Sequence, residues 1–143
     1  MARYVTTIAS NLSAPEAFAY MADFSNAQEW DPSVVEATRR SDGPVENGST
    51  FDLIVKFGGR SLPMRYEIVS FDPPGRVIIE SRNSRFTSRD TITVSPAGTG
   101  STMQYDAILD FKGAGRLLDP VMQVIFNRTG AKAEAGMRRC LNP

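Results

Sequence analysis

The sequence predicts an α+β fold, in which a seven-stranded, curved antiparallel sheet wraps around a long C-terminal helix and two short helices follow the first strand. Apolar and polar residues alternate through most of the chain, which indicates strands. Turn-forming clusters of Gly, Pro, Asn and Asp interrupt this alternation at short intervals. The end of the chain changes to a helical pattern. A length of 143 residues corresponds to one domain, residues 1–143.

The first elements are a strand and two short helices. Residues 3–11 alternate as a strand does. Ser13 then precedes Pro15-Glu16, which places an N-cap, a proline in the first turn and a capping-box glutamate in succession, so we expect a helix over residues 14–22. A second helix of one or two turns is expected near Ser25–Trp30, with Ser25 as its N-cap and Asp31-Pro32 as its end.

Six further strands are expected between Val34 and Lys112. The clearest is Thr50–Phe57, where large apolar residues alternate with Asp52 and Lys56. Residues 103–111 show the same alternation. Because short loops join these strands, the sheet is expected to be an antiparallel meander with one face towards the core.

The chain then shows a long amphipathic helix over about residues 115–141. Asp119-Pro120 is expected to mark a helix start or a kink. Gly130 and Gly136 each cost this helix about 1 kcal/mol relative to alanine. The predicted apolar stripe, which should face the sheet, consists of Leu118, Val121, Met122, Ile125, Phe126, Thr129, Ala133, Gly136, Met137 and Cys140.

The amino-acid composition excludes several classes of function. Sixteen basic and sixteen acidic residues give no net charge, which argues against a nucleic-acid-binding domain. The chain has no histidine, so catalysis by histidine and metal binding by histidine are both excluded. We expect neither a metal nor a cofactor. A single cysteine fits a reducing compartment. Without a signal segment or a long apolar run, we expect a cytoplasmic protein that is not inserted in a membrane, as a monomer or homodimer.

The order and spacing of several short motifs resemble the START-related helix-grip (SRPBCC) superfamily, in its polyketide cyclase/dehydrase and lipid-transport branch. The resemblance covers nearly the whole chain and implies the helix-grip fold, with a hydrophobic pocket between the curved sheet and the C-terminal helix. No catalytic signature of the cyclase-type members matches here residue for residue. The motifs are Ala14-Pro15-Glu16, Asp23-Phe24, Trp30-Asp31-Pro32, Tyr66-Glu67-Ile68-Val69, Asp72-Pro73-Pro74, Gly98-Thr99-Gly100-Ser101-Thr102 and Leu117-Leu118-Asp119-Pro120.

Strand parity and the helical stripe then give the residues expected to line this pocket. Trp30 is either an aromatic at the pocket mouth or a core anchor between helices and sheet. The other expected ligand-binding residues are Phe51, Leu53, Val55, Met64, Tyr66, Phe86, Ser88, Asp90, Met103, Tyr105, Leu118, Val121, Met122, Ile125 and Thr129.

Asp90 is the most informative of these residues. It shares parity with apolar positions of its strand, so its carboxyl group should point into the pocket, where desolvation would raise its pKa. Asp90, Tyr66 and Tyr105 are therefore the candidate catalytic groups. The alternative for Asp90 is a structural role at the strand end, paired with an arginine such as Arg89 or Arg82.

Two functions follow from the pocket. The first is the binding of a hydrophobic or aromatic small molecule, lipid or polyketide-like. The second is an enzyme of the cyclase or dehydratase type that uses the pocket aspartate and tyrosines. Convergence of two or more ionisable groups inside the pocket would favour chemistry. A third interpretation is an interaction protein whose pocket is vestigial.

Overall fold

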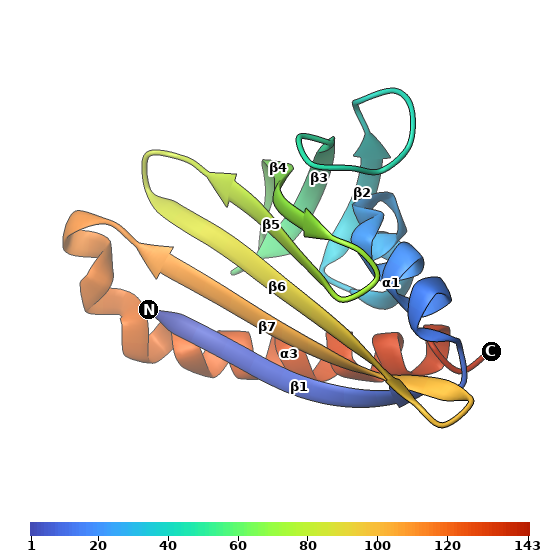
Figure 1. The fold of residues 1–143 in the computed structure, drawn as a ribbon. Coiled ribbons are helices and arrows are strands. Elements are labelled where there is room, and N and C mark those ends of the chain that lie inside the picture. The colour runs from blue at the N-terminus through green and yellow to red at the C-terminus, as the bar shows by residue number, and fades with distance from the viewer.

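The computed structural model describes residues 1–143 and forms a strongly curved sheet with a long helix across its open side (Figure 1). The predicted α+β helix-grip architecture is confirmed, including all seven strands. The strands are β1 (Ala2–Ser10), β2 (Val34–Arg39), β3 (Thr50–Phe57), β4 (Arg60–Asp72), β5 (Arg76–Arg82), β6 (Phe86–Ala97) and β7 (Gly100–Phe111).

The helices also follow the predicted order. The first short helix has the predicted limits, and the second begins with a 3-10 turn. The C-terminal helix starts at Asp119, which is one of the two outcomes expected at Asp119-Pro120. A 3-10 segment precedes it, so the α-helix does not extend back to residue 115. The helical elements are α1 (Ala14–Ala22), η1 (Phe24–Asn26), α2 (Ala27–Trp30), η2 (Gly113–Leu118) and α3 (Asp119–Cys140).

Local chemistry explains where the short helices begin and end. The Ser13 hydroxyl accepts a hydrogen bond from the Glu16 amide at 3.3 Å, as the capping box predicts. The 3-10 turn η1 is capped by Asp23, whose carboxylate accepts from the Ser25 amide, rather than by Ser25 itself. The helix α2 stops at Trp30, one residue before Asp31-Pro32.

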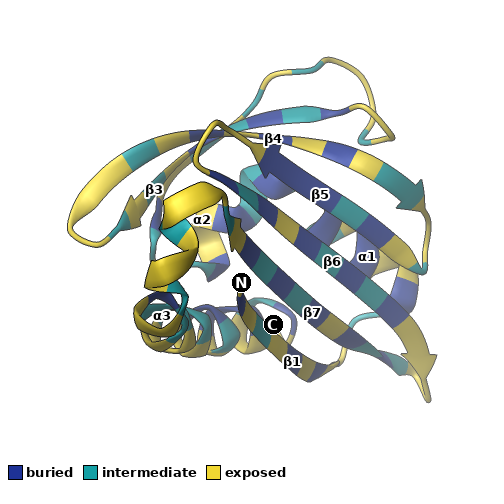
Figure 2. Ribbon diagram, turned by 90° about the vertical axis from the view of Figure 1, so that its left-hand side faces the viewer, coloured by how far each residue is buried: buried dark blue, intermediate teal, exposed yellow.

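The strands are arranged in the order β1-β7-β6-β5-β4-β3-β2, and every neighbouring pair is antiparallel. Only the placement of β1 departs from a simple meander, because it pairs with β7 at the far edge. In that pair Thr6 lies opposite Tyr105 and Ile8 opposite Met103. Buried and exposed residues alternate along the strands (Figure 2), so one face of the sheet forms the core.

The concave face of the sheet is covered by different elements at its two ends. Helix α1 packs against β6 and β7, whereas α3 runs along β1 and contacts α2 (Figure 1). Because these helices cover different parts of the sheet, the region between α1, α2 and α3 leaves room for a cavity.

No helix is both long and apolar enough to cross a bilayer.

Only part of the apolar stripe predicted for α3 is buried. Met122, Ala133, Gly136 and Met137 are buried, but Leu118 and Val121 are 52% and 58% exposed. The prediction of burial for these two is wrong. Leu118 ends a 3-10 segment, in which three residues make a turn, so its side chain is out of phase with the α-helical stripe. Val121 lies on the side of α3 that faces away from the sheet.

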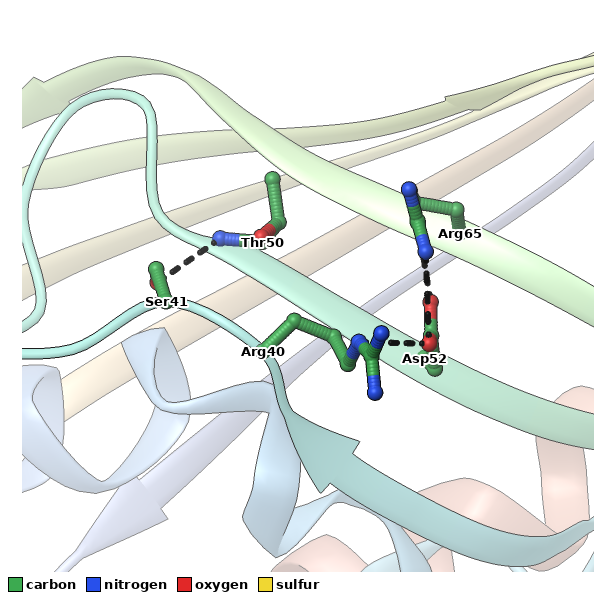
Figure 3. Close-up of polar contacts among 5 residues, drawn as sticks. All are labelled: Arg40, Ser41, Thr50, Asp52 and Arg65. Carbon is green, nitrogen blue, oxygen red and sulfur yellow. Dashed lines mark hydrogen bonds and ion pairs between the residues drawn. The ribbon is translucent and has the colours of Figure 1, made fainter.

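The outer face of the sheet carries paired charges. On β3, the Asp52 carboxylate lies 3.0 Å from Arg40 Nε and 3.0 Å from Arg65 Nε (Figure 3). On β5, Glu80 is buried between Arg82 and Arg89 and pairs with both. Arg89 lies opposite Glu80 across the β5–β6 pair, so this hairpin carries a cross-strand ion pair on its outer face.

Gly136 allows α3 to approach α2 closely. A Cβ atom at this position would lie 2.0 Å from the Trp30 carbonyl oxygen, which is backbone and cannot rotate away. The glycine that costs helix propensity is thus required by the helix–helix contact. At Gly130 the atom met is instead a ring carbon of Tyr4, at 2.4 Å.

We predict that Gly136→Ala destabilises the protein by about 1–3 kcal/mol, although the same change in an unobstructed helix stabilises it by about 1 kcal/mol. Urea unfolding followed by circular dichroism measures the difference. As a control, Ala135→Gly at the neighbouring exposed position should cost about 1 kcal/mol through helix propensity alone. A Gly136→Ala protein more stable than the wild type would contradict the close contact.

Candidate ligand-binding site

A cavity of about 90 Å³ lies between the concave face of the sheet and the helices α2 and α3. Twenty residues line it, of which 15 are hydrophobic. Strands β3, β4, β6 and β7 form its floor and walls. Phe126 and Thr129 of α3 close it from the opposite side.

Most of the residues expected to line a pocket do line this cavity. They are Trp30, Leu53, Val55, Met64, Tyr66, Phe86, Ser88, Asp90, Tyr105 and Thr129. Strand parity predicted those on β3, β4, β6 and β7, because alternate residues of one strand share a face. Trp30 is only 2% exposed, so it lines the cavity as a buried anchor and does not lie at an open mouth.

The remaining expected residues do not line the cavity. Phe51 and Met103 point to the concave face but are fully buried in packed core. Met103 pairs with Ile8 and Val94, and lies towards the α1 end of the sheet. Two α3 residues miss the cavity although they contribute to the core: Met122 is buried and Ile125 is half-buried.

Leu118 and Val121 were also expected at this site, and their exposure removes them from it. A hydrophobic pattern shows that a face is buried, but it does not distinguish packed core from cavity wall. This is the reason that the stripe and the strand faces named too many residues.

Several lining residues were not expected at the site. Four of the ten continue strand faces already named, so the alternation itself could have found them: Phe57, Leu62, Ala107 and Leu109. Asp31 carried a different signal, because it belongs to the Trp30-Asp31-Pro32 motif but was interpreted only as part of a helix end. The unexpected lining residues are Phe24, Ala27, Asp31, Ser33, Val34, Phe57, Leu62, Ala107, Leu109 and Phe126.

Asp90 lies on β6 with its carboxyl group in the cavity, as parity predicted. It is 6% exposed, and it forms none of the ion pairs of the chain. Arg89 and Arg82, the possible partners, both pair with Glu80. Burial raises the pKa of Asp90 to about 7, and the hydrogen bond of Tyr105 only partly opposes this rise.

Two tyrosine hydroxyls accompany this carboxyl group. Tyr66 on β4 lies 3.0 Å from the Ser88 hydroxyl on β6, and both are buried. Tyr105 on β7 is diagonal to Asp90 across the β6–β7 pair, since Asp90 lies opposite Ala107. Burial first, and the charge of Asp90 second, raise the pKa of Tyr66 and Tyr105 well above that of a free tyrosine. Both are therefore hydrogen-bond donors at neutral pH.

Asp31 is a second carboxyl group at the cavity wall. Its carboxylate accepts hydrogen bonds from the Ser33 amide at 2.9 Å and the Ser33 hydroxyl at 2.7 Å. Burial raises its pKa, and these two hydrogen bonds work against that rise. The negative charge of Asp31 also raises the pKa of Asp90. The two carboxyl groups therefore disfavour each other's ionisation.

An aromatic cluster surrounds these polar groups. The Trp30 indole packs edge-on against Tyr105, with ring centroids 5.5 Å apart, and against Phe24 at 6.0 Å. Phe24 also meets Tyr66 at 5.3 Å. The Trp30 Nε1–H is buried and has no hydrogen-bond partner in the protein. A buried donor without a partner is costly, so this N–H lowers the stability of the folded protein.

The raised pKa of Asp90 predicts a pH-dependent stability. The folded protein holds a proton on Asp90 that the unfolded chain releases near pH 3.8, so this contribution is present below about pH 4 and is lost as the pH rises through about 7. We expect Asp90→Asn to become more stable relative to wild type as the pH rises over this range, by roughly 1–4 kcal/mol.

Urea unfolding of both proteins at about pH 5 and pH 8 measures this difference. Asp110→Asn is the matched control, because Asp110 is an exposed carboxylate on β7. Parallel pH profiles for Asp90→Asn and the wild type would show that Asp90 is not buried without a counter-charge.

Comparison with solved structures shows the same fold in distant proteins. A START superfamily protein from Mycobacterium smegmatis is 16% identical, with a TM-score of 0.77 over 97% of this chain and 96% of that one. A major latex-like protein from Panax ginseng is 10% identical, with a TM-score of 0.71 over 99% and 97%. At these identities, the likeness shows the fold alone.

A third similar structure is the di-domain ARO/CYC protein StfQ from the steffimycin biosynthetic pathway. It is 14% identical, with a TM-score of 0.70 over 96% of this chain and 48% of that one. Comparison with curated protein sequences gives no match. The sequence itself matches the family described as polyketide cyclase / dehydrase and lipid transport over residues 1–140. The fold, its hydrophobic cavity and this match agree, and the chain belongs to the polyketide cyclase/dehydrase and lipid-transport family.

Proposed function

We propose that this protein binds a hydrophobic or aromatic small molecule, lipid or polyketide-like, in the cavity between its sheet and α3. The observation that carries the proposal is the composition of the cavity wall, which is mostly apolar and aromatic with a few polar groups brought together at one place. Ligand sites combine these two properties, because apolar surface supplies affinity and a few polar groups fix orientation.

The size of the cavity favours a compact ligand. About 90 Å³ is small beside the ~300–1,000 Å³ that is usual for ligand pockets. One or two rings would suit this space better than an extended acyl chain. A longer ligand would have to displace part of α3, where Phe126 and Thr129 close the cavity.

We predict that ligand binding changes the fluorescence of Trp30, the single tryptophan of the chain, because its ring forms part of the cavity wall. A panel of fatty acids, flavonoids and aromatic polyketides is titrated, and native mass spectrometry checks the stoichiometry. Ala107→Leu, which adds a side chain inside the cavity, should weaken binding at least about tenfold.

Ala131→Leu on the exposed face of α3 is the control and should bind like the wild type. The carrier function loses its support if the whole panel leaves the fluorescence unchanged and native spectra show only unliganded protein. Equal binding by Ala107→Leu and wild type would move the ligand to another part of the surface.

A specific observation favours a second function, an enzyme of the cyclase or dehydratase type. Asp90, with a pKa of about 7, shares the cavity with the hydroxyls of Tyr66 and Tyr105. Such a carboxylate can remove a proton from the carbon next to a ligand carbonyl, while a tyrosine donates a hydrogen bond to the enolate oxygen that forms. This convergence of ionisable groups is the feature expected of a catalyst rather than of a simple carrier.

The enzyme function predicts that the protein accelerates exchange of the α-protons of β-tetralone with deuterium from the solvent. NMR follows the reaction, whose rate should rise as the pH passes about 7, because only the ionised Asp90 accepts a proton. Asp90→Asn should abolish the acceleration while the ketone still binds. Exchange no faster than in buffer, with binding intact, would leave the carrier function and reject the enzyme.

A further inference from the structure

The charges of the cavity wall are unbalanced. Asp31 and Asp90 both line the cavity, and no lysine or arginine is among the 20 lining residues, although the chain has sixteen basic residues. An aspartate in an apolar site with no positive partner is energetically costly when ionised. The site thus lacks the positive charge that would complement it.

Two acids on the outer face of the sheet, in contrast, have arginine partners. On the outer face, Asp52 lies between Arg40 and Arg65 (Figure 3). Asp106 of β7 pairs with Arg3 of β1 at 2.8 Å. Asp90 is on β6, beside β7, but its side chain is on the opposite face from the arginines. The cross-strand pairing that neutralises the outer acids therefore cannot reach it.

The aromatic rings around the carboxyl groups suit a cation. Trp30, Tyr66 and Tyr105 present aromatic surface in the same cavity as Asp90. The electron-rich face of an aromatic ring attracts an ammonium group, most strongly in tryptophan, and a neighbouring carboxylate adds a charge-assisted hydrogen bond. An anionic ligand, by contrast, would meet two acids and no base.

A further polar atom of a lining residue has no hydrogen-bond partner. The Nε1–H of Trp30 is buried without a partner, and only 2% of this residue is exposed. A ligand oxygen or π-system could accept its hydrogen bond. This observation is independent of the carboxyl groups and concerns a residue of the same cavity wall.

We propose that the ligand of this cavity is a compact aromatic amine, whose protonated nitrogen lies against Asp90 and Asp31 among the rings of Trp30, Tyr66 and Tyr105. This inference rests on the proposed binding function and names the chemical class of its ligand. The ammonium group supplies the missing positive charge, while the ring of the ligand occupies the apolar part of the cavity.

The pH dependence expected of amine binding follows from the groups that face Asp90. These are Asp31, Tyr66 and Tyr105, and the raised pKa values of the two tyrosines keep them neutral. An ammonium group favours the ionised form of Asp90, so affinity for an amine should increase as the pH rises through about 7. A neutral ligand should show no such increase.

The test compares three ligands of nearly the same shape and different charge: phenethylamine, propylbenzene and hydrocinnamate. Calorimetry and Trp30 fluorescence at about pH 8 measure each affinity. We expect phenethylamine to bind at least about tenfold more tightly than propylbenzene, and hydrocinnamate to bind more weakly than both. This comparison uses the wild-type protein and does not depend on the folding of a variant.

Variants then show which carboxyl group causes the preference for the charged ligand. Asp90→Asn should reduce the preference for phenethylamine over propylbenzene to about twofold or less, and Asp31→Asn should reduce it in the same direction. Asp110→Asn, an exposed carboxylate on β7, should leave the preference unchanged. A preference retained in Asp90→Asn would place the amine elsewhere.

The outcomes separate this inference from the proposed function. Propylbenzene bound as tightly as phenethylamine, or hydrocinnamate bound more tightly than either, overturns the amine inference and leaves a hydrophobic binding site. If none of the three binds, the amine inference also fails, and the larger ligand panel decides the fate of the binding function.

Discussion

The close approach of α3 to the backbone of Trp30 is the contact on which the rest of the structure depends. Gly136 brings the helix against the Trp30 carbonyl, and this contact fixes the end of α2 between helix and sheet. The Trp30 indole is thereby held against Phe24 and Tyr105, deep inside the fold. The same contact sets the separation of α3 from the sheet and hence the space left for a ligand.

The cavity keeps polar groups that a purely structural core would avoid. Asp90 is buried without a positive partner, and Trp30 Nε1 without an acceptor. Each destabilises the unliganded protein, and neither is needed to form the sheet or to pack α3. Local features that reduce stability without helping the fold are typical of binding and catalytic sites. The site thus differs from the core in chemistry as well as in packing.

Much of the fold could be predicted from the sequence, because periodicity and turn chemistry are local properties. The capping box at Ser13 and Glu16 gave the limits of α1, and strand parity placed Asp90 on the inner face. The predictions that failed concern residues whose surroundings depend on packing between elements far apart in the sequence. No local pattern shows that Met103 is packed whereas Tyr105, two residues along the same strand face, borders a cavity.

The same limit explains the errors on the C-terminal helix. The helical wheel placed Leu118 on the same stripe as the residues after Asp119, but Leu118 belongs to the 3-10 segment and lies off that stripe. The two helix glycines were counted only as a loss of propensity, because the Trp30 carbonyl that requires Gly136 lies about a hundred residues earlier in the chain. Asp31 was likewise interpreted only as part of a helix end, because no local pattern shows the cavity that it lines.

The pairing of β1 with β7 also determines when the protein can fold. Thr6 meets Tyr105 only after about a hundred intervening residues have been synthesised, and α3 packs on β1 later still. The first strand must therefore wait, unpaired, while the β2–β7 meander forms from contacts between neighbouring strands. The contacts that close the cavity join residues far apart in the sequence, and such contacts form late in folding. A nascent chain therefore acquires its binding site last.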